Sequence, residues 1–329
     1  NKFLRPAHKK ILIYGTFYGE TLFKEMEVNL CPYYQPYEIR RSNKIENIDF
    51  DVVLLHFDHQ RAFMSEYLSM KPLKKKNMIV FAMEPPHSVR NSFDYQLSKD
   101  YFNHWAFNYM QSSFFFGPYG DYTEKKNSNY SLREIKEQFG TRKNASFSVI
   151  SNCGNVQSLR LDYIEELQQF FKVDTYGGCF GSKTSQEDRI EKMLTYKFFI
   201  AAENSHCVDY CTEKYWDAVY NGAIPIVIGH PTNLKALIPG TFINAFDFSH
   251  PKYLAKYLEK VVSDEKEFIK YHAWREKYIV RYFPFDCCKI LDTITSLLDQ
   301  GDIEDPTIHL IDDDSVCIPA QLAYNALVK

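Results

Sequence analysis

The chain has 329 residues, of which 45% are hydrophobic and 25% are charged, and its net charge is −3 at neutral pH. This length predicts about two domains, and the composition is typical of a soluble globular protein. The small negative charge excludes a general attraction to nucleic acid or to anionic membranes. The sequence has no apolar run of about 18 residues, so we expect no membrane-spanning segment within it.

Three short apolar runs in the first part of the chain predict strands. They are KILIYG (10–15), DVVLLHF (51–57) and MIVFAM (78–83). Runs without alternation fit strands that are buried on both faces, as in a parallel sheet. The composition then becomes rich in Gly, Asn and Lys over 117–144, which predicts a surface connection between two domains.

The second part of the chain alternates between strand and helix patterns. The predicted strands are 146–151, 172–176, 196–202 and 223–229, and the predicted helices are 156–171, 186–195, 213–221 and one or two within 250–279. Such alternation indicates βαβ crossovers and a parallel sheet. We therefore predict an α/β protein with two parallel-sheet domains, 1–145 and 146–329, in which residues of about 280–329 are able to pack back on the first.

Ligands of open α/β sheets bind outside the carboxyl ends of the strands, so charged residues at strand ends are candidates for function. The stretch ENSHCVDYCTEK (203–214) follows a predicted strand and enters a helix that Asp209 or Thr212 could cap. Lys214 falls in the first turn, where a cation opposes the helix dipole. It fits there if an anion such as phosphate lies against the helix end. The alternative is a lysine that points to solvent.

Arg160 has a similar position, because it follows the strand 146–151 and lies in the first turn or so of the next helix. Alone it would most often be a surface arginine. Two cations at two strand ends of one sheet, Arg160 and Lys214, instead suggest a shared diphosphate, to which an arginine can donate two parallel N–H bonds.

Glu84 lies in FAMEPPHS (81–88), at the end of the third apolar run. Pro85 and Pro86 restrict the backbone that follows it. A carboxylate that emerges from apolar surroundings tends to have a raised pKa, which suits a general base. The alternative is an ordinary glutamate at a strand end.

Other polar groups are weaker candidates. Asp49 and Asp51 have the spacing of a metal-binding DxD motif, but they lead into a buried strand and fit a strand boundary better. The run DDD (312–314) fits a solvated loop, and His56 and His59 fit the border of a cleft. No pair of histidines has the spacing of a helical zinc site, so we predict no metal site.

The cysteines leave two possibilities open. The eight are Cys31, Cys153, Cys179, Cys207, Cys211, Cys287, Cys288 and Cys317. No CxxC pair occurs, and the even count permits disulfides, including bonds from Cys31 to Cys287, Cys288 or Cys317. Free buried thiols are the alternative. The sequons at Asn129 and Asn144 would be glycosylated only in a secretory lumen.

The segment YKFFIAAENSHCVDYCTEKYWDAVYNGAIPIVIG (196–229) resembles the signature of the α1,3/4-fucosyltransferases, YKF–x–ENS–x–DY–x–TEK–x–G–x–P–x–G. Residues 148–181 and 242–275 resemble the family segments before and after this signature. The motif FAMEPPHS (81–88) resembles, more loosely, the first-domain motif ESP-x-HS. The resemblance covers about 78–290 and is strongest in the second half.

The resemblance implies a GT-B fold, with two Rossmann-like domains that face a cleft, the first for the acceptor and the second for GDP-fucose. It implies donor-binding roles for Arg160 and Lys214 at the diphosphate, for Asn204, Tyr210 and Glu213 at the nucleotide or fucose, and for Glu203 of the same motif. Glu84 matches the catalytic base of the family. Pro85 departs from the family pattern, in which serine is usual at that position.

These features predict an inverting fucosyltransferase that moves L-fucose from GDP-β-L-fucose to a glycan hydroxyl. We expect an α1,3 linkage to GlcNAc in an N-glycan or lactosamine, with an oligosaccharide or glycoprotein as acceptor and no nucleic acid as partner. No metal should be obligatory, although Mn²⁺ could stimulate. Family members are Golgi type II membrane proteins, so the chain resembles the lumenal part, and membrane contact would need an N-terminal anchor outside it.

Two alternatives remain open at this point. One is a sugar-binding module that keeps the GT-B fold without turnover. The other is a GT-B transferase that uses a different nucleotide sugar.

Overall fold

The computed structural model describes residues 9–17, 37–45, 48–126, 132–154, 158–282 and 286–328. Its contacts divide the chain into two units. Unit 1 comprises Asn1–Gly117 and Phe285–Ser315, and unit 2 comprises Pro118–Pro284 and Val316–Lys329. Among the described residues, no helix has the length and apolar character needed to cross a membrane.

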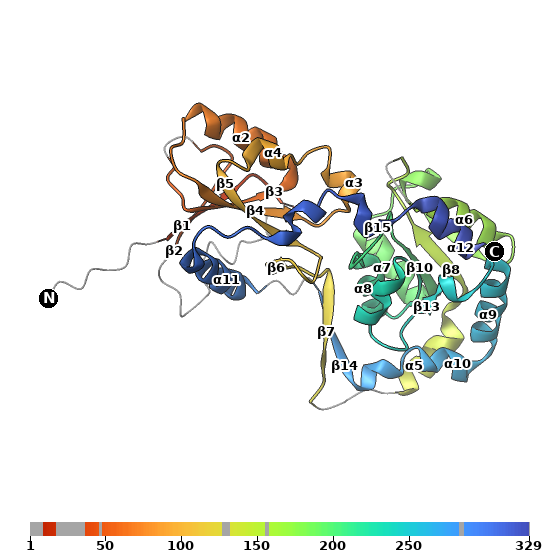
Figure 1. Ribbon diagram of the computed structural model, residues 1–329. Helices are drawn as coiled ribbons and strands as arrows, with labels where there is room; N and C mark the ends of the chain where they lie inside the picture. Colours follow the sequence, from red (N-terminus) through yellow and green to blue (C-terminus); the bar gives the residue numbers. More distant parts are fainter. Residues whose placement is uncertain are drawn as a thin grey trace. The chain divides into compact units, whose positions relative to one another are not determined.

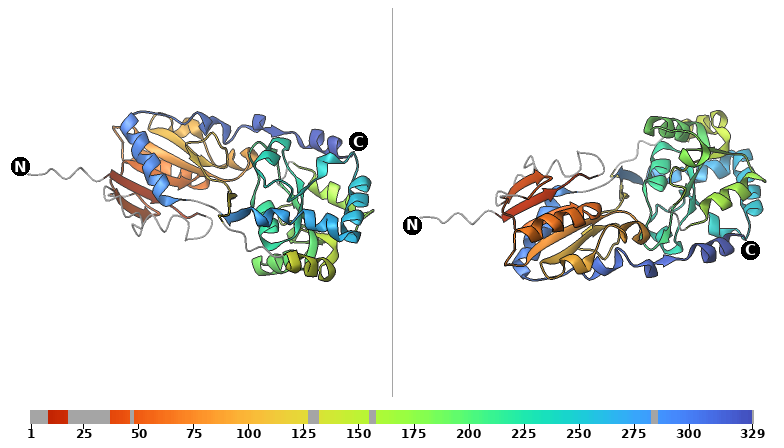
Figure 2. Two further views of the ribbon diagram at one scale, coloured as in Figure 1. Left: turned by 90° about the horizontal axis from the view of Figure 1, so that it is seen from below. Right: turned by 90° about the horizontal axis from the view of Figure 1, so that it is seen from above.

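Unit 1 is built on a six-stranded parallel sheet of order β2-β1-β3-β4-β5-β6 (Figure 1). The strands are β1 (Lys9–Tyr14), β2 (Tyr37–Ser42), β3 (Val52–His56), β4 (Lys76–Ala82), β5 (Phe102–Asn108) and β6 (Phe115–Phe116). The helices are η1 (Phe57–His59), α2 (Gln60–Ser69), α3 (Pro86–Val89), α4 (Tyr95–Ser98), α11 (Cys287–Gln300) and η6 (Pro306–Leu310), and η7 (Asp314–Val316) follows. Helices α2 and α11 lie on opposite faces of the sheet, as Figures 1 and 2 show.

The apolar runs that predict β1, β3 and β4 are confirmed as buried strands. Alternate side chains such as Val53 and Val80 pack against Phe63 and Tyr67 of α2 in one core. Strand β5 has no apolar run in the sequence, because polar residues such as His104 interrupt it, yet all seven of its residues are buried. Burial on both faces and polar partners elsewhere in the chain explain this strand.

The partners of β5 come from the C-terminal part of unit 1. Trp105 Nε1 donates to the carbonyl O of Ile303 at 2.8 Å. The fully buried carboxylate of Asp305 accepts from the backbone N of Ala106 and of Phe114, at 3.2 and 2.7 Å, and also caps η6. The late residues 285–315 thus complete the first sheet domain.

Unit 2 is built on a five-stranded parallel sheet of order β13-β12-β10-β8-β9, with two antiparallel pairs, β7 with β14 and β11 with β15. The strands are β7 (Gly120–Glu124), β8 (Lys143–Val149), β9 (Val173–Tyr176), β10 (Tyr196–Ala202), β11 (His206–Cys207), β12 (Ile224–Ile228), β13 (Ile243–Asn244), β14 (Tyr278–Tyr282) and β15 (Cys317–Ile318). The α-helices are α5 (Leu132–Thr141), α6 (Arg160–Gln168), α7 (Gln186–Thr195), α8 (Glu213–Asn221), α9 (Pro251–Ser263), α10 (Glu265–Lys270) and α12 (Ala320–Leu327). Short 3₁₀ helices are η2 (Gly178–Phe180), η3 (Pro231–Ala236), η4 (Ala245–Asp247) and η5 (Ala273–Glu276).

The central strand β10 shows how the helices of unit 2 form two outer layers. Phe198 and Ile200 point to one face, where they share a core with α6 and α9. Phe199 and Ala201 point to the other face, where they share a core with α7 and α8. The uniform apolar run YKFFIAA therefore predicted this strand correctly, because both of its faces are covered.

The described residues of the segment 117–144 have more regular structure than its composition predicts. It contains β7, which pairs with β14, and the helix α5, so it belongs largely to unit 2. The two-stranded ribbon of β7 and β14 is polar because one of its faces is exposed. Helix α5 is polar because Ile135 is the one buried residue among its described side chains. The division of the chain accordingly falls at Gly117, earlier than the predicted boundary between residues 145 and 146.

Two disulfides hold loops of unit 2, Cys153–Cys179 and Cys207–Cys317. Cys317 therefore pairs with Cys207 and not with Cys31, which lies outside the described residues. Of the two sequons, Asn144 is exposed at the start of β8, and Asn129 lies outside the described residues.

We predict that Asp305→Ala lowers the free energy of unfolding of unit 1 by about 3 kcal/mol or more, because it leaves several buried donors without an acceptor. Asp302→Ala is the matched control, since Asp302 is exposed and accepts one bond, from Asn103 Nδ2. Denaturant unfolding followed by tryptophan fluorescence would measure both. Equal losses in the two variants would contradict the role given to Asp305.

Candidate functional site

The sheet of unit 2 has a topological switch point between β8 and β10. The chain leaves β8 towards β9 on one side and returns to β10 on the other, from which β12 and β13 continue outward. Ligands of open α/β sheets bind at such points, outside the carboxyl ends of the strands. The loops that follow β8 and β10 are therefore the place to look for a site.

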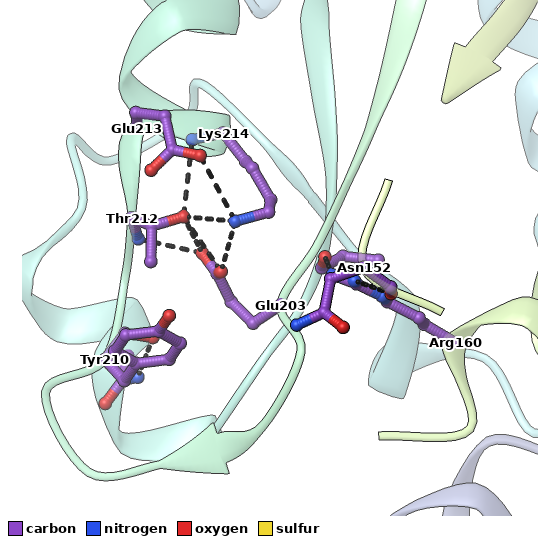
Figure 3. A network of polar contacts seen from close by, with 9 residues as sticks. Asn152, Arg160, Glu203, Tyr210, Thr212, Glu213 and Lys214 are labelled. Carbon is purple, nitrogen blue, oxygen red and sulfur yellow. Dashed lines mark hydrogen bonds and ion pairs between the residues drawn. The ribbon is translucent and has the colours of Figure 1, made fainter. Parts of the chain in front are cut away.

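Arg160 connects the two strands at this point. The sequence predicts it in the first turn or so of a helix over 156–171; in the structure it is the first residue of α6, which begins later than predicted, and only 3% of it is exposed. Its Nη1 donates to the carbonyl O of Ala202, the last residue of β10, and its Nη2 donates to that of Asn152 in the loop after β8, both at 3.0 Å (Figure 3). The preceding residue, Leu159, has φ 48° and gives the helix no side-chain cap. The positive end of α6 thus carries a buried cation.

Glu203, the first residue after β10, forms a compact network with the start of α8 (Figure 3). Its buried carboxylate accepts from the backbone N and the hydroxyl of Thr212, at 2.8 and 2.9 Å. Lys214 Nζ donates to Glu203 Oε2 at 3.1 Å, to Thr212 Oγ1 at 2.7 Å and to Glu213 Oε1 at 3.3 Å. Thr212 is the N-cap of α8. Of the two residues predicted as caps, Asp209 and Thr212, it is therefore Thr212 that caps the helix.

The charges of this network stabilise one another. Burial alone lowers the pKa of Lys214, but Glu203 and Glu213 outweigh it, so the net shift is upward. Burial raises the pKa of Glu213, but Lys214 and Arg189 outweigh it, so the net shift is downward. Burial lowers the pKa of Arg160, which the carboxylate of Glu203 opposes. Lys214 is therefore an ammonium held between two carboxylates and does not point to solvent.

Several buried polar atoms around Arg160 have no hydrogen-bond partner among the described residues. They are Ser158 Oγ, Arg160 Nε, Asn204 Oδ1 and His206 Nδ1. Buried polar atoms are usually satisfied, so a group of unsatisfied ones beside a switch point favours a polar ligand there. Sequence analysis did not identify Ser158 and His206 as site residues, because nothing in the sequence indicates that a single polar residue next to a motif is buried.

The structure brings all six predicted donor residues into one unit. Asn204 is 7% exposed and follows Glu203, and Tyr210 is 3% exposed with its ring edge-to-face with Tyr119. Glu213 begins α8. Glu84 belongs to unit 1, where it follows β4 and precedes Pro85, the N-cap of the short helix α3. It is half-buried.

The weaker candidates, Asp49, Asp51, His56 and Asp314, have structural roles within unit 1. The Asp49 carboxylate pairs with Lys10 at 2.8 Å, and Asp51 accepts from the backbone of Lys10, so both mark strand boundaries. His56 is buried within unit 1. Asp314, from the predicted solvated loop 312–314, pairs with Arg90 at 2.6 Å. The part of the chain that the structure describes contains no group of three His, Cys, Asp or Glu residues that could hold a metal ion.

Comparison with known proteins gives consistent relatives. A model described as glycosyltransferase family 10 (fucosyltransferase), C-terminal part, matches residues 139–300. Alpha-(1,3)-fucosyltransferase C of Drosophila melanogaster is 30% identical, over 87% of this chain and 75% of the fly protein. Alpha-(1,3)-fucosyltransferase fut-6 of Caenorhabditis elegans is 28% identical, over 84% of this chain and 73% of the worm protein. The match to 4-galactosyl-N-acetylglucosaminide 3-alpha-L-fucosyltransferase 9 of Mus musculus is 34% identical and covers 44% of this chain and 42% of the mouse protein.

A crystal structure of an α1,3-fucosyltransferase with GDP-fucose matches with a TM-score of 0.56 and 18% identity, over 91% of this chain and 93% of that chain. This likeness shows the fold, which is the GT-B fold of glycosyltransferases, with a parallel sheet in each unit. Because a relative that is 30% identical is matched over 75% of its length, the chain belongs to the α1,3-fucosyltransferases of glycosyltransferase family 10.

Acid should destabilise unit 2 through His206, whose side chain is fully buried beside Arg160. Burial lowers its pKa from 6.5 to about 4. The unfolded chain therefore takes up the proton first, so stability is complete above pH 6.5 and is lost as the pH falls towards 4. We predict a loss of about 3 kcal/mol from this group over that interval. Comparing denaturant unfolding at pH 7 and pH 4.5 would measure it.

His206→Gln should remove this part of the pH dependence, whereas His309→Gln, at an exposed histidine, should keep it. A His206→Gln variant that loses as much stability on acidification as the parent would show that another group is responsible.

Proposed function

We propose that the protein transfers L-fucose from GDP-β-L-fucose to a glycan hydroxyl with inversion, and that the switch point of unit 2 binds the donor. The observation that carries the proposal is the position of Arg160 and Lys214. Each lies in the first turn of a helix, Arg160 as the first residue of α6 and Lys214 as the second residue of α8, and these helices follow the neighbouring parallel strands β8 and β10. Helix N-termini and cations together hold phosphates, and a diphosphate would lie between these two.

The surrounding residues have complementary tasks in this proposal. Glu203 orients Lys214 through the ion pair, and Thr212 fixes Glu203 through its backbone N and hydroxyl. Asn204, Tyr210 and Glu213 contact the nucleotide or the fucose. The unsatisfied Asn204 Oδ1 supports such a contact, because a hydroxyl or N–H group of GDP-fucose could donate a hydrogen bond to it.

Glu84 acts as the general base. Its carboxylate takes the proton of the acceptor hydroxyl while the hydroxyl oxygen attacks the anomeric carbon of fucose. The bond from that carbon to the phosphate oxygen breaks, and GDP leaves with the electron pair. The new negative charge is stabilised by Arg160, Lys214 and the N-termini of α6 and α8. One displacement of this kind inverts the anomeric centre.

The protein cations can take over the charge stabilisation that a metal supplies in other transferases, so we propose that no metal is obligatory and that Mn²⁺ at most stimulates. The acceptor is an oligosaccharide or glycoprotein, with α1,3 linkage to GlcNAc in an N-glycan or lactosamine. The two disulfides support an oxidising compartment, and we propose the Golgi lumen, with a type II anchor in the full-length protein.

The direct test is release of GDP from GDP-fucose in the presence of an array of glycan acceptors, with and without EDTA. Transfer that persists in EDTA supports the proposal, and a complete loss restored by Mn²⁺ would overturn the metal-independent route. Thermal shift with GDP and with UDP tests the donor, since a ligand that binds only the folded protein raises its melting temperature. A shift with UDP alone would point to another nucleotide sugar.

We predict that Arg160→Ala and Lys214→Ala each weaken GDP binding about tenfold or more, because a hydrogen bond to a charged group contributes roughly 1.5–3 kcal/mol. Lys235→Ala is the matched control, since Lys235 is an exposed lysine of the same unit. Calorimetric titration with GDP measures all three.

Lys214→Ala also leaves the buried charge of Glu203 without its cation, which should lower stability. The double variant Lys214→Ala with Glu203→Gln should regain stability while GDP binding stays weak. If the Lys214 and Arg160 variants bind GDP like the parent, the diphosphate assignment is wrong.

We predict that Glu84→Gln lowers the transfer rate by about 10²–10⁴-fold, the usual contribution of a general base, while GDP affinity stays near the parent value. The amide keeps the shape of the side chain but cannot take up the proton. Asp100→Asn, at an exposed carboxylate of the same unit, should leave the rate unchanged. Near-parental transfer by a folded Glu84→Gln variant would remove Glu84 from the mechanism and direct attention to Asp58 and His87.

A further inference from the structure

The loop that carries Tyr210 makes a tight turn just before the charged network. The backbone N of Tyr210 donates to the carbonyl O of Cys207 at 3.2 Å and closes the turn. Within it, Asp209 has φ 62°, a left-handed conformation that is disfavoured for residues with a Cβ atom. Such a conformation persists only where the surroundings hold it.

Asn233 stabilises the conformation of Asp209 through hydrogen bonds to the turn. It lies in η3, which follows β12, and it is 5% exposed. Its Nδ2 donates to the carbonyl O of Cys207 at 2.9 Å and to that of Tyr210 at 3.0 Å. Its Oδ1 accepts from the backbone N of Asp209 at 2.6 Å and from Thr232 Oγ1 at 3.4 Å. One amide therefore bonds to three of the four residues of the turn 207–210, namely Cys207, Asp209 and Tyr210.

The chemistry of these contacts specifies an asparagine. The turn presents two carbonyl acceptors and one N–H donor to position 233, and an amide offers two N–H donors and one oxygen acceptor in the matching order. An aspartate of the same shape would bring a carboxylate oxygen against the two carbonyl oxygens of Cys207 and Tyr210. Because the amide protons are both used within the turn, Asn233 acts on the loop and not on a ligand directly.

The other side of the turn is held by different means. The Cys207–Cys317 disulfide and the pairing of β11 with β15 fix its first residue. The backbone N of Val208 donates to the carbonyl O of Val316 at 2.9 Å. These contacts act on Cys207 and Val208, whereas the bonds of Asn233 reach Asp209 and Tyr210.

We propose that Asn233 is a positioning residue for the donor substrate, which fixes the backbone at Tyr210 so that this side chain meets GDP-fucose. The inference rests on the proposed function, in which Tyr210 contacts the donor. It links the loop after β12 to the loop after β10, so β12, the neighbour of β10, also contributes to the site at the switch point.

The test compares Asn233→Asp with the parent. The variant keeps the size of the side chain but loses both N–H donors, so we expect the Kd for GDP-fucose to rise about tenfold or more, and the donor KM to rise more than kcat falls. Asn244→Ala is the matched control. Asn244 caps η4 in the same unit without contact to the turn, and its loss should leave the donor Kd within about twofold.

A double-mutant cycle with Tyr210→Ala separates positioning from general damage. If Asn233 acts through Tyr210, Asn233→Asp adds little to the loss of donor affinity once Tyr210 has been replaced. Additive losses would show that Asn233 supports the fold alone and would overturn the inference. Should Asn233→Asp fail to fold, Asn233→Ser, which keeps a shorter donor and acceptor, enters the same cycle with the same two outcomes.

The two proposals fail in different ways. A parent protein that binds neither GDP nor GDP-fucose would contradict the proposed function. A parent that binds GDP-fucose, beside a folded Asn233 variant that binds it equally well, would contradict only the role of Asn233.

Discussion

The buried carboxylate of Glu203 is the constraint on which the functional end of unit 2 depends. An ion that is removed from water costs several kcal/mol unless it is paired and hydrogen-bonded, so its partners must be held in place. Thr212 supplies a backbone N and a hydroxyl, and Lys214 supplies an ammonium. Meeting this requirement fixes where α8 begins and where its first cation lies. Arg160 extends the arrangement across the switch point through its bond to the end of β10.

The two units share a sheet topology but use their switch points differently. In unit 1 the switch point lies between β1 and β3. There Gly15, with φ 80°, lets the backbone pass against the ring of His59, whose Nε2 lies 3.0 Å from the carbonyl O of Thr16. In unit 2 the equivalent position carries paired charges and unsatisfied polar atoms. The same fold thus supports one position occupied by its own side chain and one with unsatisfied polar atoms, which is why function has to be argued from the site.

Local sequence patterns were sufficient to predict the elements whose limits are set by neighbouring residues. The limits of α7, α8 and β10 follow from helix capping and from uniform apolar runs, and the sequence placed them correctly. Strand β5 was missed because its polar residues are satisfied by segments far along the chain, such as Asp305. Lys214 was interpreted as a cation that awaits an anion, and the structure adds that Glu203 already pairs with it. Asn233 gave no signal, because its partners belong to a loop that only the parallel sheet brings near.

The return of residues 286–315 to unit 1 and of 316–328 to unit 2 has a consequence for the order of synthesis. Both units are discontinuous: Asp305 binds the sheet of unit 1, and Cys317 forms a disulfide with Cys207 in unit 2. Because the ribosome releases the chain from its N-terminus, unit 1 lacks Asp305 and unit 2 lacks Cys317 until those residues have been synthesised. During that time the thiol of Cys207 lacks its native partner, while the thiol of Cys211, which is free in the finished protein, lies in the same loop. Correct oxidation of Cys207 therefore has to wait for the synthesis of Cys317, and oxidation that comes too early is a route to misfolding.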